Sequence, residues 1–310
     1  MNIVHGILAI PEALAVVAVP PFLLSVIAKT KAWFGGRTGP PWLQPYYDLS
    51  KLMRKSPVYS RTTTWIFRTG PVVNLAALLT IATLVPVLSN RSALGFPGDV
   101  ILVAYLFALG RMFTVLAAMD TGSSFEGMGA SREATFGAMS EPALFLAFVV
   151  LAVATRDLQL SHMLGPALLA EWGTAAPAMV LTVGALLVVL LTETCRVPVD
   201  DPATHLELTM IHEVMVLDHS GPEFAYISYA AAMKFTLLGS VLLHVAIPHP
   251  DSFLLFDPVL RVAELIALAT VVGVIESVMA RLRLNRVPLL LAGSTVLSAL
   301  AVVFVLGRGL

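Results

Sequence analysis

Apolar residues along this chain gather in eight long runs, and polar segments separate one run from the next. A helix needs about 20 mainly apolar residues to cross the hydrocarbon core of a bilayer. The clean apolar part of the fourth run lies only between Pro142 and Arg156, so we expect its helix to begin in the polar 130s. The pattern predicts membrane-spanning helices at about 4–27, 71–89, 99–118, 136–155, 176–193, 226–248, 259–280 and 287–307.

The composition supports this interpretation. Hydrophobic residues make up 57% of the chain and charged residues only 13%, whereas ordinary soluble domains carry about 25% charged residues. The expected fold class is therefore all-α, a polytopic membrane helix bundle that forms one membrane domain over residues 1–310. The net charge of −1 gives no indication of a nucleic-acid partner, and we expect lipid and protein partners instead.

Basic residues are distributed unevenly between the two sides that these spans define. The loop after the first span holds eight Lys and Arg residues, the loops after the third and fifth hold one each, and the loop after the seventh holds three. The opposite side carries only Arg91, Arg156 and Arg308. Because Lys and Arg concentrate in cytoplasmic loops, we expect both termini on the outer, periplasmic side.

Three of the cytoplasmic loops are expected to be long, at about 28–70, 119–141 and 194–225. The first mixes glycine and proline with aromatic and basic residues, which suits a segment at the level of the lipid headgroups. It is either a membrane-surface anchor or a docking surface for a partner. The candidate docking residues are Arg37, Gln44, Asp48, Lys51 and Arg54.

The third loop is dense in acidic and histidine side chains. His205, His212 and His219 recur every seven residues, so they would share nearly one face if a single helix covered them. Histidine titrates near neutral pH, so such a row could pass protons; the alternative is a polar contact surface. A metalloprotease-type zinc site is not indicated, because Val216 stands where His212-Glu213 would need a second histidine.

Ionisable residues also lie inside the predicted spans. Arg111 and Lys234 are in the third and sixth spans, and Glu141, Glu193 and Glu276 lie near the inner ends of three others. Charges within a membrane are candidate functional groups, because burying them is costly. The alternative is structural ion pairing of the two cations with nearby glutamates. The single cysteine, Cys195, excludes an iron–sulfur cluster held by this chain alone, since such clusters need about four thiolates.

Two motifs carry a family resemblance. The stretch Glu193-x-x-Arg196-x-Pro198-x-Asp200, leading to Glu207-Leu208 and Ser220-Gly221, resembles the third cytoplasmic loop of the respiratory complex I subunit 1 family. Gly36-Arg37-x-Gly39-Pro40 resembles the opening segment of the same family. The third loop departs from the quinone-dependent pattern at Asp201, Ala203 and His205. There it is similar to the membrane subunits of formate hydrogenlyase and hydrogenase-4-type complexes.

The resemblance implies a membrane anchor and ion-translocation subunit of a multisubunit [NiFe] hydrogenase complex in the bacterial cytoplasmic (inner) membrane. No cofactor is expected on this chain; the [NiFe] centre and iron–sulfur clusters would belong to the hydrogenase large subunit and the iron–sulfur small subunit. Antiporter-like membrane subunits are further expected partners. The candidates for a proton or ion path are Arg111, Glu141, Glu193, Arg196, Asp200, Asp201, His205, Glu207, His212, Glu213, Asp218, Lys234 and Glu276.

Two other functions stay open at this point. One is a quinone-binding subunit 1 of a complex I-type oxidoreductase, which needs a cavity between the first and third loops that admits a lipid-soluble headgroup. The other is a stand-alone ion transporter. Secondary transporters commonly contain an internal repeat, and none is obvious in this sequence.

Overall fold

The computed structural model describes residues 3–200, 210–250 and 257–307, and throughout these ranges the regular structure is helical, without strands. Eight of the described helices are long and apolar enough to cross a membrane. They are α1 (Ile3–Phe34), α3 (Trp65–Leu84), α4 (Asp99–Asp120), α5 (Ser124–Thr155), α8 (Ala176–Glu193), α10 (Gly221–Ala246), α11 (Asp257–Val278) and α12 (Val287–Leu306). Each coincides with one predicted span, so that prediction is confirmed.

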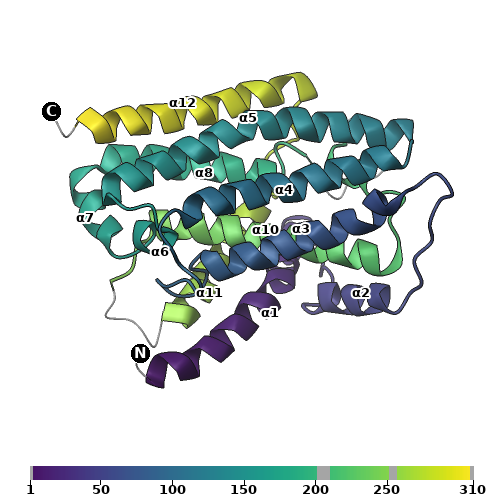
Figure 1. The fold of residues 1–310 in the computed structure, drawn as a ribbon, viewed down its shortest axis with the longest axis horizontal. Coiled ribbons are helices and arrows are strands. Elements are labelled where there is room, and N and C mark those ends of the chain that lie inside the picture. The colour runs from purple at the N-terminus through teal and green to yellow at the C-terminus, as the bar shows by residue number, and fades with distance from the viewer. Residues whose placement is uncertain (1–2, 201–209, 251–256, 308–310) are drawn as a thin grey trace.

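Short helices occupy the connections. They are α2 (Gln44–Met53), α6 (Leu160–Met163), α7 (Ala167–Thr174), α9 (His212–Met215) and the 3₁₀ helix η2 (Leu284–Arg286). The long helices lie side by side, and both ends of the chain lie at the same end of the bundle (Figure 1). We call this end, with α6 and α7, the terminal end. The opposite end, with α2, α9, the 35–64 connection and the described parts of the 194–220 connection, is the loop end.

Helix α10 lies at the centre of the bundle and packs against α1, α3, α8 and α11. Most of its side chains are buried, including Phe235 and Leu237. Helices in a bilayer gain stability by close packing of small residues. Gly70 of α3 illustrates this, because a Cβ there would lie 2.8 Å from the Ala117 Cβ and 3.0 Å from the Phe113 carbonyl oxygen of α4.

The predicted loop at 119–141 is wrong. Helix α4 ends at Asp120 and α5 begins at Ser124, so only residues 121–123 connect them. The polar start of α5 is helical because it packs against α9. Gly129 permits the approach, since a Cβ there would lie 2.3 Å from Val214 Cγ1. Gly129 is thus a contact point between two helices rather than part of a loop.

The condition for a shared histidine face, one helix over all three residues, is not met by the two histidines that the structure describes. His212 begins α9, which ends at Met215, and His219 lies in the following turn, before α10. His219 stacks instead on the ring of Phe67, with centroids 3.9 Å apart. Asp201, His205 and Glu207 lie outside the described residues.

Candidate functional site

Arg111, in the half of α4 nearer the loop end, meets carboxylates from two other helices. Its Nη1 lies 2.7 Å from Glu141 Oε1 of α5, and its Nη2 forms a very close ion pair with Glu193 Oε1 at the end of α8. Glu133 of α5 is 3.7 Å from Nε. The arginine side chain is 9% exposed, so these carboxylates supply the compensation that a buried cation requires.

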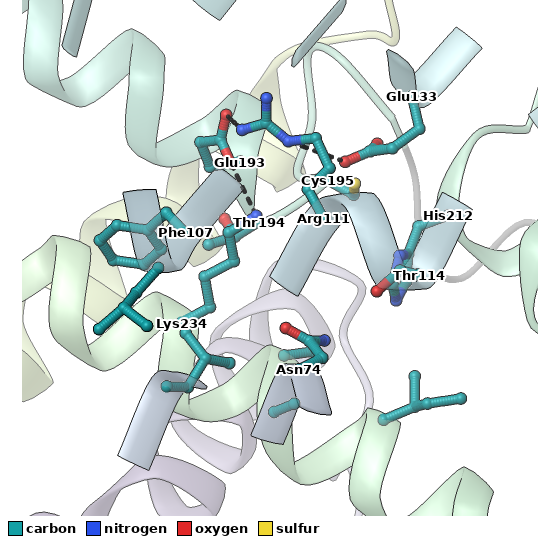
Figure 2. A pocket seen from close by; sticks show the side chains of 15 residues that line it. Asn74, Phe107, Arg111, Thr114, Glu133, Glu193, Thr194, Cys195, His212 and Lys234 are labelled. Atoms are coloured by element: carbon teal, nitrogen blue, oxygen red, sulfur yellow. Dashed lines mark hydrogen bonds and ion pairs between the residues drawn. The ribbon is translucent and has the colours of Figure 1, made fainter. Parts of the chain in front are cut away.

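Glu193 is the residue that joins the two buried cations. Lys234 of α10 reaches its second oxygen at 2.7 Å, and Ser140 donates its hydroxyl to the first oxygen at 2.6 Å. Figure 2 shows Glu193 between Arg111 and Lys234. We call Arg111, Glu133, Glu141, Glu193 and Lys234 the central network. It confirms that the two intramembrane cations pair with nearby glutamates.

Gly137 makes the geometry of Arg111 possible. It lies midway between Glu133 and Glu141 on α5, one helical turn from each. A Cβ at this position would be 2.3 Å from Arg111 Nη1 and 2.7 Å from Cζ. The missing side chain therefore lets the guanidinium lie flat against α5, between the two carboxylates.

A cavity of about 50 Å³ opens beside this network. A buried water needs roughly 10–15 Å³ by this measure and several polar partners, so the cavity has room for a few water molecules. It is lined by Arg111, Glu133, Glu193 and Lys234, together with Asn74, Thr114, Cys195 and His212 (Figure 2). Burial raises the pKa of the Cys195 thiol well above its usual value, so this residue stays a neutral thiol.

A second set of ion pairs forms around Glu276 and Asp200. The side chain of Glu276 on α11 is fully buried. It forms ion pairs with Arg196 at 3.2 Å and with Lys31 of α1 at 2.9 Å. Asp200 pairs with Arg281 at 2.9 Å and also accepts the backbone N–H groups of Ile211 and His212. These contacts fix the described parts of the 194–220 connection to α1 and to the α11–α12 connection.

The remaining candidates lie apart from the central network. Glu213 is half-buried on α9, and Asp218 is exposed and donates its backbone N–H to Glu126 at 3.0 Å. The candidate docking residues are at the loop end: Gln44 is half-buried and donates to Asp48 at 2.9 Å, while Arg37, Asp48, Lys51 and Arg54 are exposed.

Four residues that the sequence analysis did not select take part in these contacts: Glu133, Ser140, Lys31 and Arg281. A helical interpretation of 124–141 would have placed Glu133 on nearly the same face as Glu141, two turns away. The sequence carries no comparable signal for Lys31 and Arg281, whose partners come from distant helices and loops.

A groove of about 400 Å³ lies at the loop end between α1, α2 and α10. Its lining includes Leu24, Asp48, Lys51, Phe224 and Ser228. Most of the lining side chains are apolar, and a few are polar or charged. Across the described ranges, no group of three or more His, Cys, Asp or Glu side chains is arranged to hold a metal ion.

Comparison with known proteins identifies relatives of this chain. The sequence profile described as NADH dehydrogenase matches residues 7–307. Formate hydrogenlyase subunit 4 of Escherichia coli (strain K12) is 32% identical over 283 residues, covering 89% of this chain and 91% of that protein. Hydrogenase-4 component C of the same organism is 29% identical over 242 residues, covering 78% and 75% of the two chains.

A solved structure matches the fold over almost the whole chain. It is a chain in the structure of the membrane-bound sulfane sulfur reductase, an archaeal respiratory membrane complex. The TM-score is 0.81, with 20% identity over 96% of this chain and 99% of that one. With eight membrane-capable helices and a family profile that spans nearly all of its length, this chain is a multi-pass membrane protein that belongs to the NADH dehydrogenase subunit 1 family.

Proposed function

We propose that this chain is the membrane subunit of a respiratory-type [NiFe] hydrogenase complex, similar to formate hydrogenlyase, and that it couples redox chemistry to the movement of protons or sodium ions. The observation that carries the proposal is the buried central network, which joins the four membrane helices α4, α5, α8 and α10 through Arg111 and Glu193. The identity to formate hydrogenlyase subunit 4 favours the hydrogenase branch.

The loop end is the side on which partner subunits would dock. Exposed charged residues of α2 and large exposed aromatic side chains, among them Trp33, Tyr47 and Trp65, lie at this end. In the proposed orientation this side is cytoplasmic. The [NiFe] centre and the iron–sulfur clusters would belong to the docked large and small subunits, and antiporter-like subunits would lie beside the bundle in a bacterial inner membrane.

The proposed ion step uses the cavity. Glu133, Glu193 and His212 all line it, so water inside it can connect acidic groups from α5 and α8 with the 194–220 connection. Arg111 pairs with Glu193 on one side, and Lys234 pairs with it on the other. A small displacement of the 194–220 connection, caused by redox chemistry in a docked subunit, would change the access of water to these groups.

The test begins with the complex purified from its own membranes in mild detergent through a tag on this chain. We expect nickel, iron and hydrogen-evolution activity to co-purify with it. In reconstituted vesicles, Glu193→Gln is expected to reduce ion uptake per turnover at least tenfold, while the nickel content stays unchanged. Asp157→Asn is the matched control, because Asp157 is an exposed carboxylate at the terminal end and should leave uptake unaltered.

Two outcomes would contradict the proposal. If the chain purifies without a nickel-containing partner and carries ion flux alone, it is a stand-alone transporter. If Glu193→Gln and wild type show equal ion uptake, the central network is structural only.

The groove between α1, α2 and α10 favours quinone binding as a second candidate function. Its volume of about 400 Å³ suits a lipid-soluble headgroup. Its place differs from the expected one between the first and third loops, because α2 of the first loop and the helices α1 and α10 form it. A photoreactive quinone analogue should label peptides of α2 or α10, and Ser228→Trp should block that labelling. Equal labelling of wild type and Ser228→Trp would remove this candidate.

A further inference from the structure

A second cluster of buried ionisable side chains lies at the terminal end, where α10 leads into α11. The imidazole of His249 lies between two carboxylates, with Nδ1 2.8 Å from Asp257 Oδ1 and Nε2 2.8 Å from Glu264 Oε1. Arg261 donates from Nη1 to the other oxygen of Glu264 at 2.9 Å and to the Ile247 carbonyl at 3.0 Å. We call His249, Asp257, Arg261 and Glu264 the terminal cluster.

The two short contacts of His249 determine how many protons the cluster holds. A neutral imidazole has one N–H group, so it can donate to only one carboxylate. The other contact is attractive only if the imidazole is charged or the carboxyl is protonated. In either case the two hydrogen bonds contain two protons, and the four side chains, with Arg261 charged, have no net charge. Neutrality reduces the cost of burying them.

Other elements complete the surroundings. Asn90 of the α3–α4 connection donates to the His249 carbonyl at 3.2 Å, and Ser89 donates to Glu12 of α1 at 3.4 Å. His244 of α10 donates from Nδ1 to the carbonyl one turn earlier at 2.8 Å. Within the described residues, these contacts surround His249 with the following titratable or charged groups: Glu12, His244, Asp257, Arg261 and Glu264.

Two buried nitrogen atoms of Arg261 lack partners among the described residues. Arg261 is 1% exposed, yet its Nε and Nη2 have no hydrogen-bond partner there. Buried polar groups of this kind are normally satisfied by protein or by ordered water. The two buried donors of Arg261 therefore point to a hydrated site.

Polar side chains of α10 lead from the bundle interior toward this cluster. Thr236, Ser240 and His244 follow one another at four-residue spacing, so they share one face of the helix, and all three are buried. Ser240 Oγ lies 3.3 Å from His244 Nδ1. His244 is about 15 Å along the helix axis from Lys234 of the central network, at 1.5 Å per residue.

We propose that the terminal cluster is a proton-exchange site, through which the chain gives a proton to, or takes one from, the water layer at the terminal end. The proton of the Nε2–H group moves to Glu264 Oε1, so the N–H bond breaks and an O–H bond forms. The carboxylic acid then releases the proton to water, which leaves the cluster with one negative charge; the return of a proton reverses both steps. Glu264 is the exchanging group because its side chain is 12% exposed, against 7% for His249 and 4% for Asp257.

Infrared difference spectroscopy of the purified complex tests the site directly. A pH step between about 5 and 9 should produce a carboxyl band, shifted in heavy water, together with an imidazole band. Glu264→Gln, which keeps the shape and one acceptor oxygen, should remove the carboxyl band, and His249→Gln should remove both. His162→Gln is the matched control, because His162 forms an exposed pair with Asp157 at 2.7 Å at the same end. If Glu264→Gln does not assemble, Glu264→Asp should shift the band instead.

The outcomes separate this inference from the proposed function, on which it rests only for its role in ion movement. If the wild-type spectrum and that of Glu264→Gln or Glu264→Asp show the same bands, the terminal cluster does not exchange protons and the inference is overturned. In reconstituted vesicles, Glu264→Gln should lower proton uptake per turnover at least fivefold. If wild-type vesicles take up no ions while the bands still respond to pH, the coupling function fails and the proton-exchange site stands.

Discussion

At the loop end, Glu193 lies between an arginine of α4 and a lysine of α10, whereas at the terminal end His249 lies between two carboxylates of α11. The central network therefore joins four helices, α4, α5, α8 and α10, whereas the terminal cluster joins one helix to the connection that precedes it. Both compensate buried charge. The difference lies in the kind of contact. The central network consists of ion pairs between side chains of different helices, while the terminal cluster consists of hydrogen bonds in which the proton can lie on the imidazole or on the carboxylate.

The comparison predicts unequal losses of stability. Glu193→Leu leaves Arg111 without its closest partner and Lys234 without its carboxylate, so we expect the free energy of unfolding to fall by about 3–5 kcal/mol. Glu264→Leu should cost about 1–3 kcal/mol, because His249 keeps Asp257 and Arg261 keeps the Ile247 carbonyl. Denaturant titration of the complex in mixed micelles measures both. Equal losses would mean that the two clusters contribute alike.

A change at Gly137 disturbs the central network without removing a charge. Gly137→Ala would press a methyl group against the Arg111 guanidinium, so we expect a loss of about 2 kcal/mol in the free energy of unfolding, as for other overpacked sites. Gly293→Ala of α12 is the control, because a Cβ there meets nothing within 4 Å. If both variants unfold at the same denaturant concentration, Arg111 has room to move and the network is looser than its contacts suggest.

His219 at the loop end contrasts with His249. His219 is buried against the ring of Phe67, whereas His249 lies between two close carboxylates. Burial lowers the pKa of His219 to about 4, below its ordinary value of 6.5. Between these values the unfolded chain binds the proton more strongly, so stability falls as the pH drops below about 6.5, by about 1.4 kcal/mol at pH 5.5. His219→Gln should flatten this dependence, measured as the melting temperature of the complex between pH 7.5 and 5.5. An unchanged slope in the variant would show that His219 does not cause it.

The smallest expected effect concerns the ion pair between Arg281 and Asp200 at the loop end. Arg281→Gln removes the pair with Asp200, but the backbone N–H groups of Ile211 and His212 remain bound to that carboxylate. We expect a loss of about 1 kcal/mol, because the two backbone donors still satisfy the buried carboxylate. Amide hydrogen exchange at Ile211 and His212 should accelerate about fivefold, while exchange in α11 near the terminal cluster stays constant. Acceleration at both ends would show that the two regions are not independent.

The sequence predicts the eight membrane helices well, because length and apolar composition alone determine which segments can cross a bilayer. It also predicts that Arg111 and Lys234 need acidic partners. It does not identify those partners, since the choice of Glu193 depends on how α4, α8 and α10 are rotated in the bundle. The helical start of α5 was missed because its stability comes from packing against α9, where glycine serves close approach rather than a turn.

His249 was missed for a related reason. Its surroundings in the sequence are proline and aspartate of a connecting segment, and only the return of the chain along α11 brings Asp257 and Glu264 to its two ring nitrogens. Residues that act together across a turn of the chain leave no periodic signal.

The central network also has a consequence for how the protein enters the membrane during synthesis. Helix α4 emerges with Arg111 before any of its partners, and insertion of a lone arginine near the middle of a helix costs about 2.5–3.5 kcal/mol. Glu133 and Glu141 arrive next, on α5, followed by Glu193 on α8 and by Lys234 on α10. The charged helices thus emerge in the order cation, anions, anion and cation. The two acidic helices can neutralise Arg111, and Lys234 then pairs with Glu193. Helix α4 should therefore depend most on its successors to stay in the bilayer.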